Sequence, residues 1–363
     1  MRQRHRFLRD FEAGRRIDLM LVSAVTAVLG IRAYLALSGY PQVGGESLHI
    51  AHMLWGGLLM AAGLLVQMSF VSGRTVHQVA AILGGLGFGT FIDEIGKFVT
   101  RDNDYFYQPA VSLIYVSLIL LYLAGRSIHR DRIGTGHEYL ANAVEEVLEI
   151  ARGDLDEHEQ ARALRYLEQS GRRDRLARGL AEILRGADLV EPGRPSPVAR
   201  GAGWLVAQYR AVAGTRTFGL VLIVFFSLQF LAQMVRLFAL ADLLPAAPVR
   251  IMHVPVVNPL PASTDLYEPS HWLQLGSGLL AGAFVAGGMI LLFRQRLRAL
   301  RMFQRAVLVN VFLTQVFVFY RVEWAGLVGL AFNLLLFFAL RFAVEREQRW
   351  REEQELRTSR PHV

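Results

Sequence analysis

The chain alternates between long apolar stretches and shorter segments rich in arginine. Eight of the apolar stretches come close to the roughly 20 residues that a membrane-spanning helix needs. They are residues 19–38, 47–71, 76–99, 110–124, 218–244, 272–293, 306–320 and 325–344. The pattern predicts an all-α protein, a polytopic integral membrane bundle of about eight transmembrane helices, with a small cytoplasmic helical insert between the fourth and fifth.

Arginine placement predicts the orientation, because cytoplasmic loops collect lysine and arginine. Most of the 39 basic residues fall at both ends of the chain, in the central polar segment and in two short loops, all of which an even number of spans puts on one side. We expect a bacterial-type inner membrane protein with both termini in the cytoplasm. Its predicted parts are a first membrane half (1–128), the insert (129–216), a second membrane half (217–344) with a proline-rich outer loop (245–270), and a cytoplasmic tail (345–363).

Three helices are predicted in the insert. An apolar stripe from Leu140 to Ala151 closes at Gly153, Asp156 with Glu159 resembles a capping box, and a third stripe ends at Gly186. Two interpretations stay open. The insert is either a helical hairpin packed under the membrane domain, or a module over residues 137–186 that binds a cytoplasmic partner, forms a homo-oligomer or lies on anionic lipid.

Polar side chains inside the predicted spans indicate a site, because such groups are costly in lipid and face a protein interior or a water-filled cavity. The second span begins with Glu46, His49 and His52, and the third ends with Asp93, Glu94 and Lys97, the only lysine of the chain. At about 1.5 Å of rise per residue, the two groups lie at matching depths in the outer leaflet. Gly85 and Gly89 predict that the third span approaches a neighbour closely.

These residue types suit a divalent metal such as Zn, Mn or Fe, with Glu46, His49, His52 and Asp93 as ligands. In this interpretation Asp93, Glu94 and Lys97 are catalytic, and a metal-activated water attacks a lipid or a lipid-linked substrate. Further polar residues predicted at the same level bind the substrate. They are Arg32, Asp104, Gln229, Gln233, Arg236 and Arg321.

The segments 46–52 and 93–97 resemble those of membrane-embedded metal hydrolases of the ceramidase-like kind. The resemblance covers these two segments only and lacks a set of three histidines, so it assigns no catalytic role. Two other interpretations stay open: an ion- or proton-coupled transporter, or a sensor that signals through the insert. A buried ion-pair network of Arg32, Asp93, Glu94 and Lys97 is the structural alternative. With no cysteine and no nucleic-acid-binding motif, thiol chemistry and nucleic-acid partners are excluded.

Overall fold

The computed structural model describes residues 8–39, 52–101, 107, 109–128, 134–190, 269–292 and 294–358, with scattered positions between 200 and 231. In these ranges every regular element is a helix, which confirms the predicted all-α class. The chain divides into two compact units. The first contains Met1–Tyr107 and Val116–Arg194, and the second contains Gln108–Tyr115 and Pro195–Val363.

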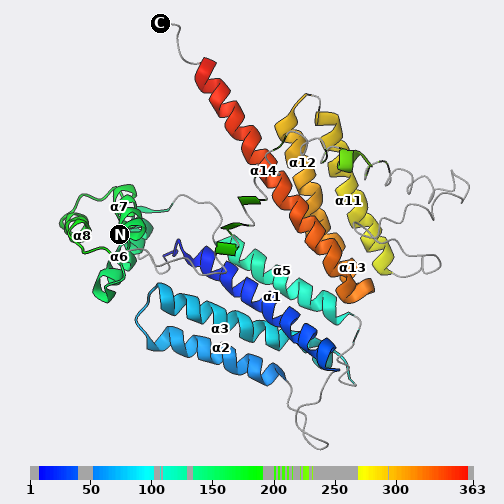
Figure 1. The fold of residues 1–363 in the computed structure, drawn as a ribbon, viewed down its shortest axis with the longest axis horizontal. Coiled ribbons are helices and arrows are strands. Elements are labelled where there is room, and N and C mark those ends of the chain that lie inside the picture. Colours follow the sequence, from blue (N-terminus) through cyan, green and yellow to red (C-terminus); the bar gives the residue numbers. More distant parts are fainter. Residues whose placement is uncertain are drawn as a thin grey trace, which may run out of the picture. The chain divides into compact units, whose positions relative to one another are not determined.

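Five helices of the first unit belong to the apolar part of the chain (Figure 1). They are α1 (Ala13–Ser38), α2 (His52–Ser69), α3 (Arg74–Asp93), the short α4 (Ile95–Val99) and α5 (Ala110–Ile128), whose first residues belong to the second unit. Helix α3 packs against both α1 and α2. The predicted third span is interrupted at Glu94, which has left the helical conformation and separates α3 from α4.

Glycines bring α1 and α3 into close contact, as Gly85 and Gly89 predicted. A Cβ atom at Gly85 would lie 2.2 Å from the carbonyl oxygen of Met20, and one at Gly89 would lie 2.2 Å from that of Ala24. Only glycine permits backbones to approach this closely. From Gly85 to Gly89, the contacted residue on α1 moves from Met20 to Ala24. Residue numbers rise in the same direction along both helices, so α1 and α3 run parallel.

Helix α2 packs on another face of α3, also through glycines. A Cβ atom at Gly87 would lie 2.6 Å from the carbonyl oxygen of Gly56, and one at Gly63 would lie 3.1 Å from that of Ala80. Here the contacts advance in opposite directions, so α2 is antiparallel to α3. The N-terminal ends of α1 and α3 therefore lie at one end of this bundle, and their C-terminal ends lie at the other.

The insert contains the three predicted helices, α6 (Gly136–Arg152), α7 (Glu157–Gln169) and α8 (Arg175–Arg185). Gly153 closes α6 in the left-handed conformation, Asp156 and Glu159 form a capping box before α7, and Gly186 ends α8. A small core of leucine and alanine side chains holds the three helices together. A second capping box, made by Thr135 and Glu138, starts α6.

The second unit contains α11 (Pro269–Leu292), α12 (Arg296–Val309), the π-helical turn η1 (Asn310–Thr314), α13 (Gln315–Val322), the short η2 (Glu323–Ala325) and α14 (Gly326–Thr358). Its core includes Phe226 stacked on Phe303, with ring centroids 4.5 Å apart. Helix α12 begins in the segment predicted as a loop, and α14 continues beyond residue 344 into the predicted tail.

Five helical segments of the described chain are long and apolar enough to cross a membrane, and Gly276–Leu292 is a shorter apolar helix. These helices are compatible with a membrane-embedded protein. The count of eight spans stays a prediction, because most of the predicted span 218–244 lies outside the described residues. Residues 245–268 of the predicted outer loop lie outside them too.

Candidate functional site

Five charged or titratable side chains converge where the C-terminal ends of α1 and α3 meet the start of α2. We call this group the charged cluster: Arg32 of α1, His52 of α2, Asp93 and Glu94 at the end of α3, and Lys97 of α4. The side chains of both acids are 0% exposed. The convergence of His52 with Asp93 and Glu94 is the one predicted from their matching depths.

Arg32 and His52 hold the carboxylate of Asp93 from two sides. The Arg32 Nε donates to Oδ1 at 2.6 Å, and its Nη2 donates to the backbone oxygen of Asp93 at 2.9 Å. The Nε2 atom of His52 lies 3.1 Å from Oδ2. Arg32 was predicted to bind substrate, and in the structure it is the counter-ion of Asp93.

Glu94 is held by Lys97, by a backbone amide and by the other face of the same imidazole. The Lys97 Nζ lies 2.5 Å from Oε1, and the Met53 N–H donates to Oε2 at 2.8 Å. The Nδ1 atom of His52 lies 3.4 Å from Oε1. Lys97 follows Asp93 by four residues, a spacing that would place both on one face of an unbroken helix. The interruption at Glu94 changes that spacing, so that Lys97 contacts Glu94.

Of the remaining predicted site residues, the structure describes only Arg321. Glu46, His49, Asp104, Gln229, Gln233 and Arg236 lie outside the described residues. Arg321 belongs to the second unit, where its Nη1 lies 3.2 Å from the Gln274 side-chain oxygen. Within the part of the chain that the structure describes, no group of three or more histidine or acidic residues is arranged to hold a metal ion.

A second set of ion pairs joins the insert to the N-terminal ends of α1 and α3. In this junction the Arg9 Nε donates to Glu138 at 2.8 Å, the Arg16 Nη2 to Glu145 at 3.2 Å and the Arg74 Nη1 to Glu159 at 2.9 Å. Backbone groups add further bonds: Phe11 N–H donates to Asn142, and Arg74 N–H donates to Glu149. These pairs were not predicted from the sequence, although one of the two interpretations of the insert packed it under the membrane domain.

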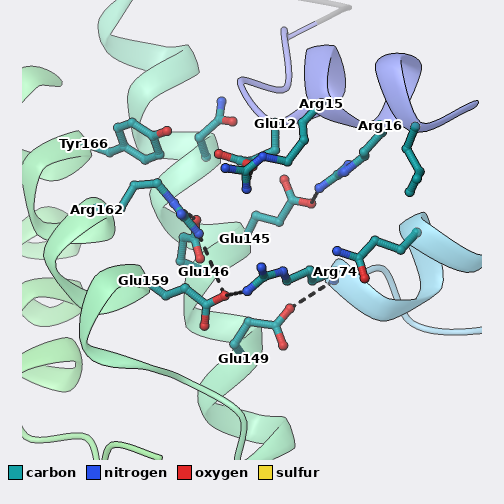
Figure 2. A pocket seen from close by; sticks show the side chains of 13 residues that line it. Glu12, Arg15, Arg16, Arg74, Glu145, Glu146, Glu149, Glu159, Arg162 and Tyr166 are labelled. Atoms are coloured by element: carbon teal, nitrogen blue, oxygen red, sulfur yellow. Dashed lines mark hydrogen bonds and ion pairs between the residues drawn. The ribbon is translucent and has the colours of Figure 1, made fainter. Parts of the chain in front are cut away.

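A cavity of about 260 Å³ lies inside the junction (Figure 2). Its walls are arginines of α1 and α3 on one side and glutamates of α6 and α7 on the other. Arg162 of α7 donates to Glu146 at 2.7 Å, and burial raises the pKa of that carboxyl above its ordinary value. At the edge of the junction, the hydrogen bond from Arg9 lowers the pKa of Glu138 to about 2.

One signal in the sequence indicated the junction. Glu138, Asn142, Glu145 and Glu149 recur at helical spacing on α6, beside the apolar stripe that forms the core of the insert. Such a polar stripe usually faces water. Here it faces the arginines of α1 and α3. From the sequence, these arginines were attributed to the enrichment of basic residues in cytoplasmic segments.

No protein-family model, no curated protein and no solved structure matches this chain. The functional interpretation therefore comes from the residues and their geometry.

Proposed function

We propose that this protein is a membrane sensor, in which the charged cluster takes up a proton and the helical insert passes the change to the cytoplasm. One observation carries the proposal. Helices α1 and α3 each hold the charged cluster near their C-terminal end and the junction with the insert near their N-terminal end. Two parallel helices thus link a buried titratable group to a soluble domain.

The geometry around His52 supports a proton as the stimulus. Its Nε2 faces Asp93 and its Nδ1 faces Glu94, at 3.1 and 3.4 Å. A neutral imidazole has only one N–H, so it can donate to one of these carboxylates and presents a lone pair to the other. A second proton on the ring satisfies both contacts. Histidine is the side chain whose charge ordinarily changes near neutral pH.

The ion pairs of the cluster support the same interpretation. Among the described residues, Arg32 and Lys97 each form an ion pair with one of the two acids, Asp93 and Glu94. Protonation of His52 changes the strength of its contacts with both acids, which are also held by Arg32 and Lys97. A redistribution of these contacts gives the cluster a physical reason to rearrange.

The packing of α1 on α3 supports transmission to the junction. Backbone contacts at Gly85 and Gly89 leave no room for side chains to absorb a displacement. Closely packed interiors respond to such displacements by moving elements as bodies. A shift of α1 against α3 at Arg32 and Asp93 therefore also displaces Arg16 and Arg74 at the other end of these helices. Both arginines bind the insert.

The contacts of the carboxylates favour this proposal over the metal-dependent hydrolase. Each oxygen of Asp93 and Glu94 already accepts a contact, from Arg32, from His52, or from Lys97 and the Met53 amide. These contacts hold both acids in place through protein groups of the described residues. A transporter remains the alternative proposal; Gly84–Gly89 lie within the continuous helix α3, and the span is interrupted at Glu94.

Because the chain has no cysteine, a pair of spin labels tests the proposal directly. Met68→Cys reports on the end of α2 nearest the junction, and Glu157→Cys reports on the insert. We expect the distance between the labels, measured in lipid nanodiscs, to change between pH 8 and pH 5.5. The change should be lost in His52→Gln, which cannot take up the proton.

Two matched variants control this experiment. His158→Gln removes an exposed histidine of the insert and should leave the change intact. His77 lies at the junction, 3.4 Å from Glu145, and is itself titratable. A pH response that survives in His52→Gln and disappears in His77→Gln would place the proton at the junction and contradict the proposal. So would an unchanged distance in the unsubstituted protein.

A further inference from the structure

A second set of polar side chains is buried in the apolar helices of the second unit, away from the proposed sensor. The set comprises Gln274 and Ser277 of α11, Asn310 and Thr314 of η1, Gln315 of α13 and Asn333 of α14, each less than one-tenth exposed. Polar groups in such helices are costly unless they bond to one another or to a ligand. Their hydrogen bonds show which of the two applies.

The set is centred on the π-helical turn η1. Single π-turns within longer helices are uncommon and frequently mark functional sites. The wider turn changes the bonding of the backbone, and the Tyr115 hydroxyl donates to the carbonyl oxygen of Val311 at 2.6 Å. A side chain from another helix thus supports the irregular turn.

Both hydroxyl groups of the set already donate their hydrogen in a hydrogen bond. The Ser277 hydroxyl donates to the backbone oxygen of Gln274 at 2.9 Å. The Thr314 hydroxyl lies 3.0 Å from Ser277 Oγ and 3.4 Å from Asn310 Oδ1, and its single hydrogen serves one of them. The oxygen lone pairs that remain can accept, and the hydroxyls have nothing left to donate.

Asn333 adds a further buried oxygen on α14, a helix that contacts η1. Leu336, three residues further along α14, belongs to the same core as Val307 and Val311 on either side of the start of η1, and Leu330 packs against that core. The amide nitrogen of Asn333 donates to a carbonyl one turn back on its own helix. Its Oδ1 is buried, and among the described residues it has no hydrogen-bond partner. A buried acceptor in that state is costly unless something binds it.

We infer that these oxygens form a site for an alkali cation, with Asn333, Asn310, Thr314 and Ser277 as ligands. The set offers amide and hydroxyl oxygens and no carboxylate, whereas divalent Ca²⁺ and Mg²⁺ rely on carboxylates. Neutral oxygens at irregular turns of membrane helices are suited to a dehydrated monovalent cation. The inference concerns the second unit alone and does not depend on the proposed sensor.

Thermal unfolding of the purified full-length protein tests the site. Tm is measured in NaCl, KCl and choline chloride at equal ionic strength, over a range of concentrations. We expect a saturable rise in Tm with Na⁺ or K⁺ that choline does not produce. Asn333→Leu should abolish the rise. Thr314→Val, which keeps the side-chain shape, should raise the half-saturating concentration at least tenfold.

Gln295 provides the matched control, because it also buries an unpartnered amide oxygen but lies at the start of α12. Gln295→Leu should keep the full response to the cation. Equal Tm values in all three salts would mean that these oxygens bind only water, and the inference would be wrong. A response that persists in Asn333→Leu would also overturn it. If Asn333→Leu fails to fold, Thr314→Val decides, and an unchanged half-saturating concentration in Thr314→Val would overturn the inference.

Discussion

Arg32 binds Asp93 twice, through its side-chain carboxylate at 2.6 Å and through its backbone oxygen at 2.9 Å. The backbone contact falls at the last residue of α3, where the carbonyl groups reach the end of the helix. Arg32 therefore neutralises a buried acid and also caps the end of the helix that carries it. A lysine, with a single compact charge, could not make both contacts in this geometry.

Asp93→Ala should destabilise the protein strongly, because it leaves the guanidinium of Arg32 buried without its partner. Breaking one side of a buried ion pair typically costs about 3–5 kcal/mol. The double variant Arg32→Leu with Asp93→Ala should be less destabilised than the sum of the single variants Arg32→Leu and Asp93→Ala. Unfolding in a detergent titration measures all three. Simple additivity would show that the two residues act independently and would contradict the assigned pairing.

Gly89→Ala should destabilise the contact between α1 and α3, since the added Cβ would meet the Ala24 carbonyl at 2.2 Å. Overpacking of this kind typically costs about 1–3 kcal/mol. Gly84 lies on the same helix with open space around it, so Gly84→Ala should be neutral or stabilising by up to about 1 kcal/mol. We expect a lower Tm for Gly89→Ala and an unchanged or higher Tm for Gly84→Ala. A lower Tm in both variants would argue against the parallel packing.

Glu138→Gln should make the stability of the protein less sensitive to acid. The folded protein holds the pKa of Glu138 at about 2, below its ordinary value of 4.5. The carboxylate therefore stabilises the fold above pH 4.5, and this contribution is lost as the pH falls toward 2. Thermal melts at pH 6 and pH 3 should show a difference between the two proteins that shrinks at the lower pH. Glu157→Gln, at an exposed position, should show no such trend.

Features that depend on neighbouring residues were predictable from the sequence. Gly153, Asp156 and Gly186 mark helix ends as predicted. Caps are formed by side chains and backbone groups within a few residues, so the local sequence is enough to identify them. The charged cluster was also predictable in outline, because ionisable groups in apolar spans must meet one another. Depth counting was enough to pair His52 with Asp93 and Glu94.

Features that depend on tertiary contacts were missed. The interruption at Glu94 has no glycine or proline to signal it. The carboxylate of Glu94 instead binds the amide of Met53 and the ammonium of Lys97, and these bonds accompany the break. The pairs Arg9–Glu138 and Arg74–Glu159 join residues 129 and 85 positions apart. No local sequence pattern relates partners so far apart. Each arginine was also already explained by the enrichment of basic residues in cytoplasmic segments.

Labelling from each side of the membrane tests the sidedness on which the proposed sensor depends. If the insert is cytoplasmic, Glu157→Cys should react with a membrane-impermeant maleimide only in inverted vesicles. Arg101→Cys, just beyond the charged cluster, should react only in right-side-out vesicles, because α3 and α4 lie between it and the junction. Ala61→Cys, in the middle of α2, should react in neither. Reaction of Glu157→Cys and Arg101→Cys from the same side would mean that α3 does not cross the membrane, and a proton taken up at His52 could not then be reported across it.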